Sequence, residues 1–400
     1  MAKIKVLVTF GTRPDAAKMA PLVKELARRR DDFETVVCTT AQHREMLDQV
    51  LSAFDLTPDF DLDLMTPRQT LSGLAQRILQ AFEPVLDEVQ PDIVLVHGDT
   101  QTTLMGGLIS FFKQMMVGHV EAGLRTYERY APFPEEISRQ LTARLAQLHF
   151  APTAANKANL LAERIPAESI FVTGNTVIDA IQTTVRPDYT FINPLLQQLC
   201  SSGRRLLTVT AHRRENLGQP LQEIAYGLKD IAETHDDIAI CYAVHLNPAV
   251  QETVRPILSN LPNVYLTDPL ELLDMHNLMA RSTLILTDSG GLQEEAPALG
   301  KPVLVLRDVT ERQEAVEAGT VLLIGPHRQR ILSETNRLLA DRDAYQQMAR
   351  AHNPYGDGRA CERICEALLF TFGRRSAPPA EFFPLNPATS EPIPGSSLDA

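Results

Sequence analysis

Three acidic residues in the first half of the chain are placed where they could transfer protons. Asp99 ends the His-Gly-Asp segment that closes one short apolar run, Glu121 comes directly after another, and Glu135 follows in a Pro-Phe-Pro-Glu-Glu segment. If these runs are parallel strands, the residues that follow them meet at one edge of a sheet. Carboxylates that converge there repel one another, which raises their pKa values toward the range of general acids and bases. A simpler explanation stays open, in which Asp99 or Thr100 caps a helix and Glu135 stabilises a first helical turn.

The second half of the chain carries groups suited to hold a diphosphate. A Ser-Gly-Gly sequence before an expected helix offers a hydroxyl, unhindered N–H groups and the positive end of a helix dipole. Glu295, one turn into that helix, could accept hydrogen bonds from both hydroxyls of a ribose. A Gly-Gly turn with a capping serine is the structural alternative. The candidate residues for this nucleotide site are His212, His245, Ser289, Gly290, Gly291 and Glu295.

Arg13 is a further candidate for contact with a phosphate. It follows Gly11, which permits a tight turn and a close approach of a ligand to the backbone, and its guanidinium can bind a phosphate through two hydrogen bonds. Only one glycine is present, so the segment is not the G-x-G-x-x-G pattern of dinucleotide-binding proteins. A structural turn that carries a surface arginine would explain the residues almost as well.

Two series of apolar runs alternate with helical segments and must position these side chains. The runs are apolar throughout, which favours parallel sheets covered on both faces. We therefore expect an α/β fold with two Rossmann-like, doubly wound domains that face each other across a cleft, with the active site in the cleft. The expected strands are 5–9, 35–40, 93–97, 116–120, 148–151 and 170–173, followed by 206–210, 238–243, 263–267, 284–287, 303–306 and 321–324.

The expected domain boundaries follow from the same patterns. Residues 1–185 form the domain with the catalytic acids, and residues 186–372 form the nucleotide-binding domain. The last helix of this second part either stays in it or packs back on the first domain. Residues 373–400 are rich in Pro, Ser, Ala and Glu and are expected to form a disordered tail.

Composition excludes several classes of protein. A net charge of −12 argues against general binding to nucleic acid, which requires basic surface. No apolar run approaches eighteen residues and no signal peptide precedes the first strand, so a cytoplasmic protein without membrane contact is expected. The five cysteines are scattered and predict reduced thiols. No H-x-H or H-E-x-x-H motif occurs, and we expect neither a metal nor a cofactor.

Eight motifs in the same order resemble the non-hydrolysing UDP-N-acetylglucosamine 2-epimerases. The resemblance covers about 370 residues and leaves only the tail outside. It implies the two-Rossmann fold that this family shares with the GT-B glycosyltransferases. The motifs are Phe10-Gly-Thr-Arg-Pro, residues 42–49, His97-Gly-Asp-Thr, residues 119–125 and Pro134-Glu-Glu in the first domain, and residues 212–216, 288–295 and 352–358 in the second.

The resemblance also implies a reaction. The proton at C2 of UDP-N-acetylglucosamine is removed, UDP leaves C1, and a glycal stays bound until UDP re-adds after reprotonation on the other face. The product, UDP-N-acetylmannosamine, is a precursor for cell-surface polysaccharide. By position in the motifs, Asp99, Glu121, Glu135 and His212 are the acid/base and leaving-group set. The residues that would hold UDP are Arg13, His245, Ser289, Gly290, Gly291 and Glu295.

Members of the family that are regulated by their substrate bind a second molecule of it beside the active site. Gln42, His43 and Arg68 match the segments that do so, which predicts activation of this protein by its own substrate. A homodimer is implied as well. Three positions depart from the family pattern, one of which is Phe133, where some members have tryptophan or methionine. Asp15 stands where glutamate is usual, which could alter reach toward a ligand, and Glu45 replaces the glutamine of some regulated members, which weakens the activator prediction.

Four alternatives stay open at this level. A hydrolysing epimerase would release free N-acetylmannosamine and UDP. A GT-B glycosyltransferase would share the nucleotide half but would also need an acceptor site. An epimerase for a modified UDP-sugar could use the same catalytic set. A sugar-nucleotide sensor without catalysis would bind UDP, but a cluster of three acids at strand ends argues against it.

Overall fold

The structure is a computed structural model, which describes residues 2–41, 44–66 and 69–384. Among these residues, contacts divide the chain into two units. The first unit comprises residues 2–183 together with 355–384, and the second comprises residues 184–354. These units are defined by contacts. The domain boundaries at 185 and 372, which we expect from the sequence, stay predictions.

The first unit is built on a parallel sheet of seven strands in the order β3-β2-β1-β4-β5-β6-β7. The chain winds outward from β1 in one direction and then returns to wind outward from β4, which is the doubly wound arrangement. Every residue of β4 is buried, as expected for a strand covered on both faces. The strands are β1 (Ile4–Phe10), β2 (Phe33–Thr39), β3 (Phe60–Asp61), β4 (Ile93–His97), β5 (Met116–Val120), β6 (Leu148–Ala151) and β7 (Ile170–Val172).

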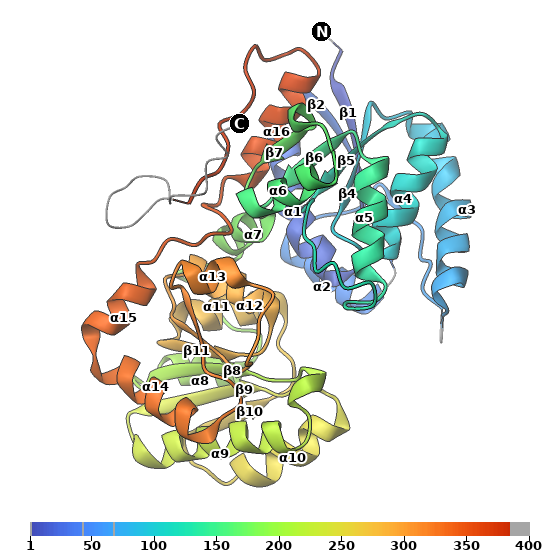
Figure 1. The fold of residues 1–400 in the computed structure, drawn as a ribbon. Helices are drawn as coiled ribbons and strands as arrows, with labels where there is room; N and C mark the ends of the chain where they lie inside the picture. The colour runs from blue at the N-terminus through green and yellow to red at the C-terminus, as the bar shows by residue number, and fades with distance from the viewer. Residues whose placement is uncertain (1, 42–43, 67–68, 385–400) are drawn as a thin grey trace. The chain divides into compact units, whose positions relative to one another are not determined.

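Two layers of helices cover this sheet. Helices α3, α4 and α5 lie side by side on one face, while α1 packs against α2 and α16 (Figure 1). Threonine side chains cap the first turns of α1, α3 and α4, which satisfies N–H groups that have no partner in the helix. The helices are α1 (Arg13–Arg28), α2 (Arg44–Ala53), α3 (Leu71–Val89), α4 (Gln101–Phe112), α5 (Glu135–Leu145), α6 (Ala154–Ala162), η1 (Ala167–Ser169), α7 (Thr176–Thr184) and α16 (Ala360–Thr371).

The second unit repeats the design with a parallel sheet of six strands in the order β10-β9-β8-β11-β12-β13. All six residues of β9 are buried. The prediction of two doubly wound parallel α/β sheets is therefore confirmed. The strands are β8 (Arg205–Thr210), β9 (Ile238–Ala243), β10 (Val264–Thr267), β11 (Leu284–Thr287), β12 (Val303–Val305) and β13 (Val321–Leu323).

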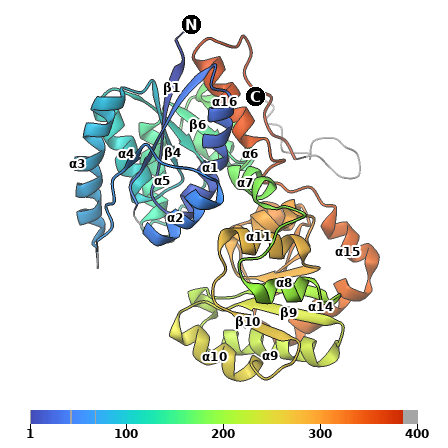
Figure 2. The same ribbon diagram turned by 180° about the vertical axis from the view of Figure 1, so that it is seen from behind.

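Each face of the second sheet has its own apolar core. Helices α9, α10 and α14 pack together on one face over a large cluster that includes Leu228 and Ile240 (Figure 2). A smaller cluster that includes Leu196 and Leu278 lies beneath α8 and α11 on the other face. The helices are α8 (Pro194–Cys200), η2 (Arg214–Asn216), α9 (Gln219–Thr234), α10 (Pro248–Leu258), α11 (Leu272–Arg281), α12 (Gly290–Ala298), α13 (Gln313–Glu317), α14 (Arg328–Ala340) and α15 (Arg342–Ala349). In the part of the chain that is described, no helix is long and apolar enough to cross a membrane.

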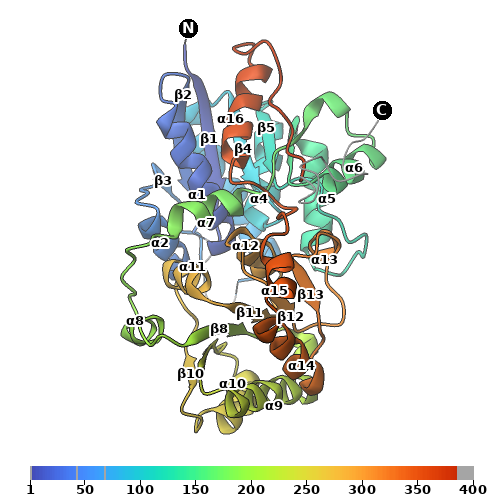
Figure 3. The same ribbon diagram turned by 90° about the vertical axis from the view of Figure 1, so that its left-hand side faces the viewer.

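The chain returns to the first unit after residue 354, and a buried aspartate holds the returning helix. The Asp179 carboxylate, on α7, accepts hydrogen bonds from the backbone N–H groups of Ala360 (3.2 Å) and Cys361 (2.9 Å) at the start of α16. Helix α16 then packs along α1 (Figure 3). Burial raises the pKa of Asp179, and the hydrogen bonds from these N–H groups oppose that rise.

For residues 374–384 the expectation of a disordered tail is wrong. The backbone N–H of Phe382 donates to the carbonyl of Val172 (2.8 Å), and the side chain of Phe382 is buried. Glu381 forms an ion pair with Lys157. One buried aromatic residue and one ion pair are enough to dock a polar segment, and composition averaged over the tail does not reveal them. Residues 385–400 lie outside the described residues.

Replacement of Asp179 by alanine is expected to destabilise the first unit by about 2 kcal/mol, because two buried N–H groups lose their acceptor. Asp341→Ala is the matched control, since Asp341 also accepts from two N–H groups at a helix start but is exposed, and its loss should cost about 1 kcal/mol or less. Urea unfolding monitored by circular dichroism would measure both. Equal losses for the two variants would contradict the role given to Asp179.

Candidate active site

The carboxyl edge of the first sheet gathers acidic and basic side chains from three neighbouring strands. β1, β4 and β5 are adjacent in the sheet. The segments that follow them carry Asp15 and Lys18, then Asp99, then Glu121. The expectation that the ends of these strands meet at one edge is met because the strands are parallel.

Glu121 is held in one place by its backbone and by two side chains. Its φ angle of +62° lies in the left-handed region, which a residue with a side chain adopts only under constraint from its surroundings. The Lys18 ammonium forms an ion pair with Glu121 Oε2, and Asn175 Nδ2 donates to the same oxygen at 2.9 Å. His97 Nε2 lies 3.8 Å from this oxygen. The carboxylate is thus fixed at the end of β5 with a cation beside it.

Asp99 is held by an arginine from α5. Arg139 Nη2 lies 2.5 Å and Nε lies 3.1 Å from Asp99 Oδ2. Burial raises the pKa of Asp99, the Arg139 guanidinium lowers it, and the Glu121 and Asp15 carboxylates raise it, with a net shift upward. Repulsion among the acids acts in the direction expected from the sequence, but burial is the larger cause.

The capping explanation applies to Thr100 and not to Asp99. Thr100 Oγ1 accepts from the Thr103 N–H and caps α4, while it donates to Asp15 Oδ2 at 3.1 Å. Asp15 Oδ1 also lies 3.5 Å from Nδ1 of His97, which is buried. Asp15, one methylene shorter than the usual glutamate, is therefore part of this polar network.

Glu135 and Arg13 each begin a helix near these strand ends. Glu135 is the first residue of α5, the helix that also carries Arg139, and Arg13 is the first residue of α1. Glu136, next to Glu135, is buried and accepts hydrogen bonds from the N–H groups of Thr126 and Tyr127. The carboxylate of Glu136 thus has a structural role, because it holds the backbone of residues 126–127. The side chain of Glu135 is half-buried at the start of the helix.

The second sheet brings its own candidate residues to its carboxyl edge. β9, β8 and β11 are adjacent, and they lead into His245, His212 and Ser289, respectively. The imidazoles of His212 and His245 are stacked, with ring centroids 5.2 Å apart and an interplanar angle of 15°. Burial lowers the pKa of His212, Asp288 raises it, and His245 and Arg213 lower it, with a net shift downward.

Ser289 does not cap the helix that it precedes. Among the described residues, its hydroxyl makes no hydrogen bond to the first turn of α12. That turn begins with Gly290 and Gly291, which leave its N–H groups unhindered. A side-chain atom at Gly290 would lie 3.0 Å from Oε1 of Glu311 and within 4 Å of the guanidinium groups of Arg213 and Arg312. The capping explanation therefore fails for the side chain of Ser289, and the start of α12 lies beside two guanidinium groups and one carboxylate.

Glu295 lies one turn further along α12, beside a buried histidine. Its Oε2 lies 3.5 Å from Nε2 of His276, and Thr184 Oγ1 is 2.7 Å from Nδ1 of the same ring. A Cβ at Gly291 would lie 3.2 Å from Glu295 Oε1, so the carboxylate sits close to the start of the helix. This arrangement allows Glu295 to accept hydrogen bonds from a ligand held there.

Comparison with known proteins decides the family. Residues 24–369 match the family described as UDP-N-acetylglucosamine 2-epimerase. The chain belongs to the UDP-N-acetylglucosamine 2-epimerase family, a family of isomerases. A UDP-N-acetylglucosamine 2-epimerase from Escherichia coli K12 is 54% identical over 378 residues, which are 91% of this chain and 98% of the relative. One from Bacillus subtilis is 52% identical over 382 residues, or 96% and 99%.

A solved structure supports the same assignment. The UDP-GlcNAc 2-epimerase from Neisseria meningitidis, crystallised bound to UDP-GlcNAc, is 46% identical to this family member. The match covers 92% of this chain and 100% of the other, with a TM-score of 0.81. The resemblance identified from the eight motifs is therefore confirmed.

Several residues that contact the predicted acids or Asp15 are missing from the sequence-based prediction. Lys18 and Arg139 balance the two acids, and Asn175 and His97 contact Glu121 or Asp15. Arg139 lies four residues after Glu135, and residues four apart share one face of a helix. This spacing is the one signal in the sequence that places Arg139 beside a predicted site residue. Lys18 and Asn175 give no such signal. Gln42, His43 and Arg68, the predicted second site, lie outside the described residues.

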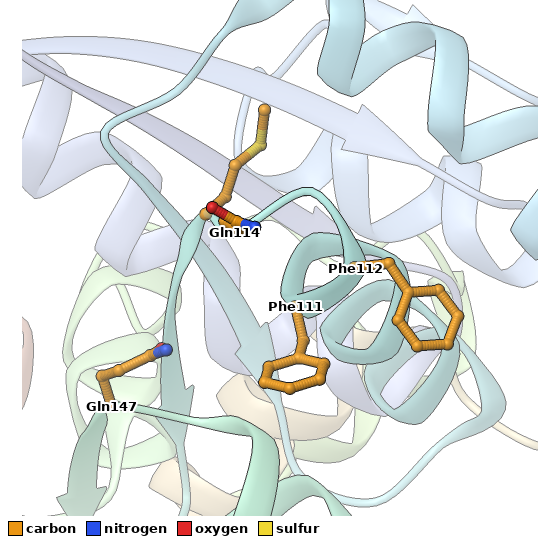
Figure 4. Close-up of a pocket in the computed structure, with 5 residues that line it drawn as sticks. Phe111, Phe112, Gln114 and Gln147 are labelled. Carbon is orange, nitrogen blue, oxygen red and sulfur yellow. The ribbon is translucent and has the colours of Figure 1, made fainter.

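One hollow of this family member lies apart from the acids. A hollow of about 480 Å³ is lined by Phe111, Phe112, Gln114, Met115 and Gln147 (Figure 4). It precedes β5 and β6, so it belongs to the amino edge of the sheet and not to the edge with the acids. Among the described residues, no cluster of three or more His, Cys, Asp or Glu side chains is arranged to hold a metal ion.

Asp99→Asn is expected to stabilise the protein at pH 8. An aspartate whose pKa is raised by folding binds its proton more tightly in the folded state, so its contribution to stability falls as the pH rises past its unfolded pKa. The variant should therefore gain stability over the wild type at pH 8 and lose that advantage toward pH 4. Thermal unfolding at both pH values measures this.

The control is Asp92→Asn, at an exposed residue that accepts from the Lys5 N–H. Asparagine keeps the acceptor, so the free energy of unfolding should change by less than about 0.5 kcal/mol at either pH. An Asp99→Asn variant that is less stable than the wild type at pH 8, with a deficit that shrinks on acidification, would contradict the environment given to Asp99.

Proposed function

We propose that this protein reversibly interconverts UDP-N-acetylglucosamine and UDP-N-acetylmannosamine. A base takes the proton from C2, the electron pair of that C–H bond forms a C1=C2 double bond, and the C1–O bond breaks with its electrons leaving on UDP. Return of the UDP oxygen to C1 and delivery of a proton to the opposite face of C2 give the epimer. The two faces require two proton-transfer groups, which exchange protons with solvent between turnovers.

The observation that carries this proposal is the pair of acids Asp99 and Glu121 at adjacent strand ends. Their surroundings differ: Glu121 has the Lys18 ammonium against it, whereas burial raises the pKa of Asp99. Two carboxyls with different environments suit a reaction in which one group removes a proton while the other supplies one. Glu135, at the start of α5, completes the proposed set.

The second unit would hold the departing UDP. Its Ser289-Gly290-Gly291 helix start and the neighbouring arginine Arg213 stabilise the negative charge that develops on a diphosphate leaving group. His212 can share a proton with that oxygen, Glu295 can accept from the ribose, and Arg13 and His245 would complete the contacts. The relative from Neisseria meningitidis, whose structure contains UDP-GlcNAc, supports this choice of ligand.

Three further properties belong to the same proposal. The substrate activates the enzyme from a second site that includes Gln42, His43 and Arg68. The active protein is a homodimer in the cytoplasm. Its product supplies the synthesis of cell-surface polysaccharide. The activation, the dimer and the use of the product rest on the family to which the chain belongs, and the location rests on the sequence pattern.

Incubation of UDP-N-acetylglucosamine alone with the protein in heavy water tests the reaction. NMR should show UDP-N-acetylmannosamine with deuterium at C2, because the second proton comes from solvent. A glycosyltransferase would need an acceptor and show no exchange, and a hydrolysing epimerase would release UDP and free N-acetylmannosamine. Either outcome would contradict the proposal.

Arg139→Gln is expected to lower kcat by roughly a hundredfold, which is the size of a typical proton-transfer contribution. The Arg139 guanidinium lowers the pKa of Asp99, so its removal raises that pKa. When Asp99 is the group that removes the proton, the acidic limb of the kcat/KM profile should therefore move to higher pH.

The matched control is Arg144→Gln on the same helix, where an exposed arginine donates to the carbonyl of Glu163. Its pH profile should follow that of the wild type, with kcat within about twofold. A normal pH profile for Arg139→Gln would remove Asp99 from the proposed mechanism.

A further inference from the structure

Asp288 is a buried carboxylate that organises the loop carrying His212. Its side chain is 0% exposed. Asp288 Oδ2 accepts three hydrogen bonds, from the His212 N–H (2.7 Å), the Arg213 N–H (2.8 Å) and Asn216 Nδ2 (2.9 Å). These contacts join the end of β11 to the loop after β8, the neighbouring strand.

The second oxygen of this carboxylate faces the imidazole. Asp288 Oδ1 lies 3.6 Å from His212 Nδ1, and it has no hydrogen-bond partner among the described residues. A buried carboxylate oxygen with no donor is costly unless a neighbouring group compensates it. The Nδ1 edge of His212 is the compensating group that the geometry offers.

We propose that Asp288 is a positioning residue, which holds His212 with Nδ1 toward its own carboxylate and leaves Nε2 as the nitrogen that shares a proton with the leaving diphosphate. This inference rests on the proposed function for the role of Nε2. The orientation of the ring by Asp288 does not depend on it. The tautomer and ring orientation of a histidine are determined by the hydrogen bond that one of its nitrogens makes, and a small approach of His212 Nδ1 to Asp288 Oδ1 from their 3.6 Å separation would form that bond.

Other charged groups also act on His212, and they come from two loops. Arg213 and Glu215 lie on its own loop, and His245 stacks on it from the loop after β9. His245 and Arg213 disfavour the protonated imidazole, while Asp288 and Glu215 favour it. Asp288 is the buried member of the set that faces Nδ1, so its replacement by asparagine removes a charge that favours protonation and keeps an oxygen for the loop N–H groups.

The test measures the pKa of His212 directly. Hydrogen–deuterium exchange at imidazole Cε1 depends on protonation, and mass spectrometry can follow it in the tryptic peptide of residues 206–213, which contains His212 as its one histidine. In Asp288→Asn the pKa of His212 is expected to fall by about 1. The matched control is Asp274→Asn, another buried aspartate of the second unit that accepts three hydrogen bonds, and there the pKa of His212 should not move.

Activity supplies an independent readout. Asp288→Asn should lower kcat ten- to hundredfold with KM within about threefold, and the alkaline limb of kcat should move to lower pH, as the imidazole loses its proton more easily. A purely structural role would lower the amount of folded protein and leave the pH profile in place. An unchanged pKa of His212 in a folded Asp288→Asn protein would overturn the proposal.

A second variant covers the case in which Asp288→Asn does not fold. Asn216→Ala removes one donor from the carboxylate and leaves its charge, so the pKa of His212 should stay or rise, and a fall would overturn the proposal. The exchange measurement needs no substrate. A shifted pKa in a protein that does not epimerise would therefore contradict the proposed function alone, whereas normal epimerisation with an unmoved pKa would contradict only the role of Asp288.

Discussion

The ion pair between Lys18 and Glu121 is the interaction that holds the carboxylate of Glu121 at the carboxyl edge of the first sheet. Glu121 sits at the end of β5 with a left-handed backbone, a conformation that costs free energy and persists only where the surroundings hold it. The ammonium of Lys18 and the amide of Asn175 do so from α1 and the start of α7. The left-handed backbone at Glu121 thus lowers the stability of the fold, and it places one carboxylate at the edge of the sheet. Such a trade between stability and function is common at functional sites.

Both units use the same geometric device for different chemistry. In each, three adjacent parallel strands deliver polar side chains to one edge, and a charged group from a neighbouring segment holds them in place. In the first unit Arg139 and Lys18 hold the acids. In the second unit a buried acid, Asp288, holds a loop of basic residues. Under the proposed function the first edge moves protons and the second accepts negative charge.

The parts of the fold that follow from local pattern are predictable from the sequence. The strands 93–97 and 116–120 agree with β4 and β5 at both ends, because uninterrupted apolar runs are typical of strands buried on both faces. The two-residue strand β3, Phe60–Asp61, is too short and too exposed to show such a pattern. The folded segment 374–384 is missed because its docking depends on single contacts of Phe382 and Glu381.

The sequence identifies the candidate site residues that follow a strand, and it does not identify those that come from a helix. Asp99, Glu121, His212 and Ser289 all lie within two residues of the end of a strand, and the parallel sheets bring them to their edges. Arg139 reaches Asp99 across forty residues of sequence, and no local pattern encodes that distance. Thr100 caps α4, whereas the carboxylate of Asp99 binds Arg139. Which of the two residues caps the helix therefore also depends on the position of Arg139.

Under the proposed function, the C1–O bond breaks only together with loss of the C2 proton to these acids. UDP-N-acetylglucosamine labelled with oxygen-18 between C1 and the β-phosphorus tests it, because free rotation of the departed phosphate moves the label to a non-bridging position. The wild type should scramble the label, and Glu121→Gln should lose scrambling and C2 exchange together. Scrambling at the wild-type rate in a variant that no longer exchanges C2 would contradict the account.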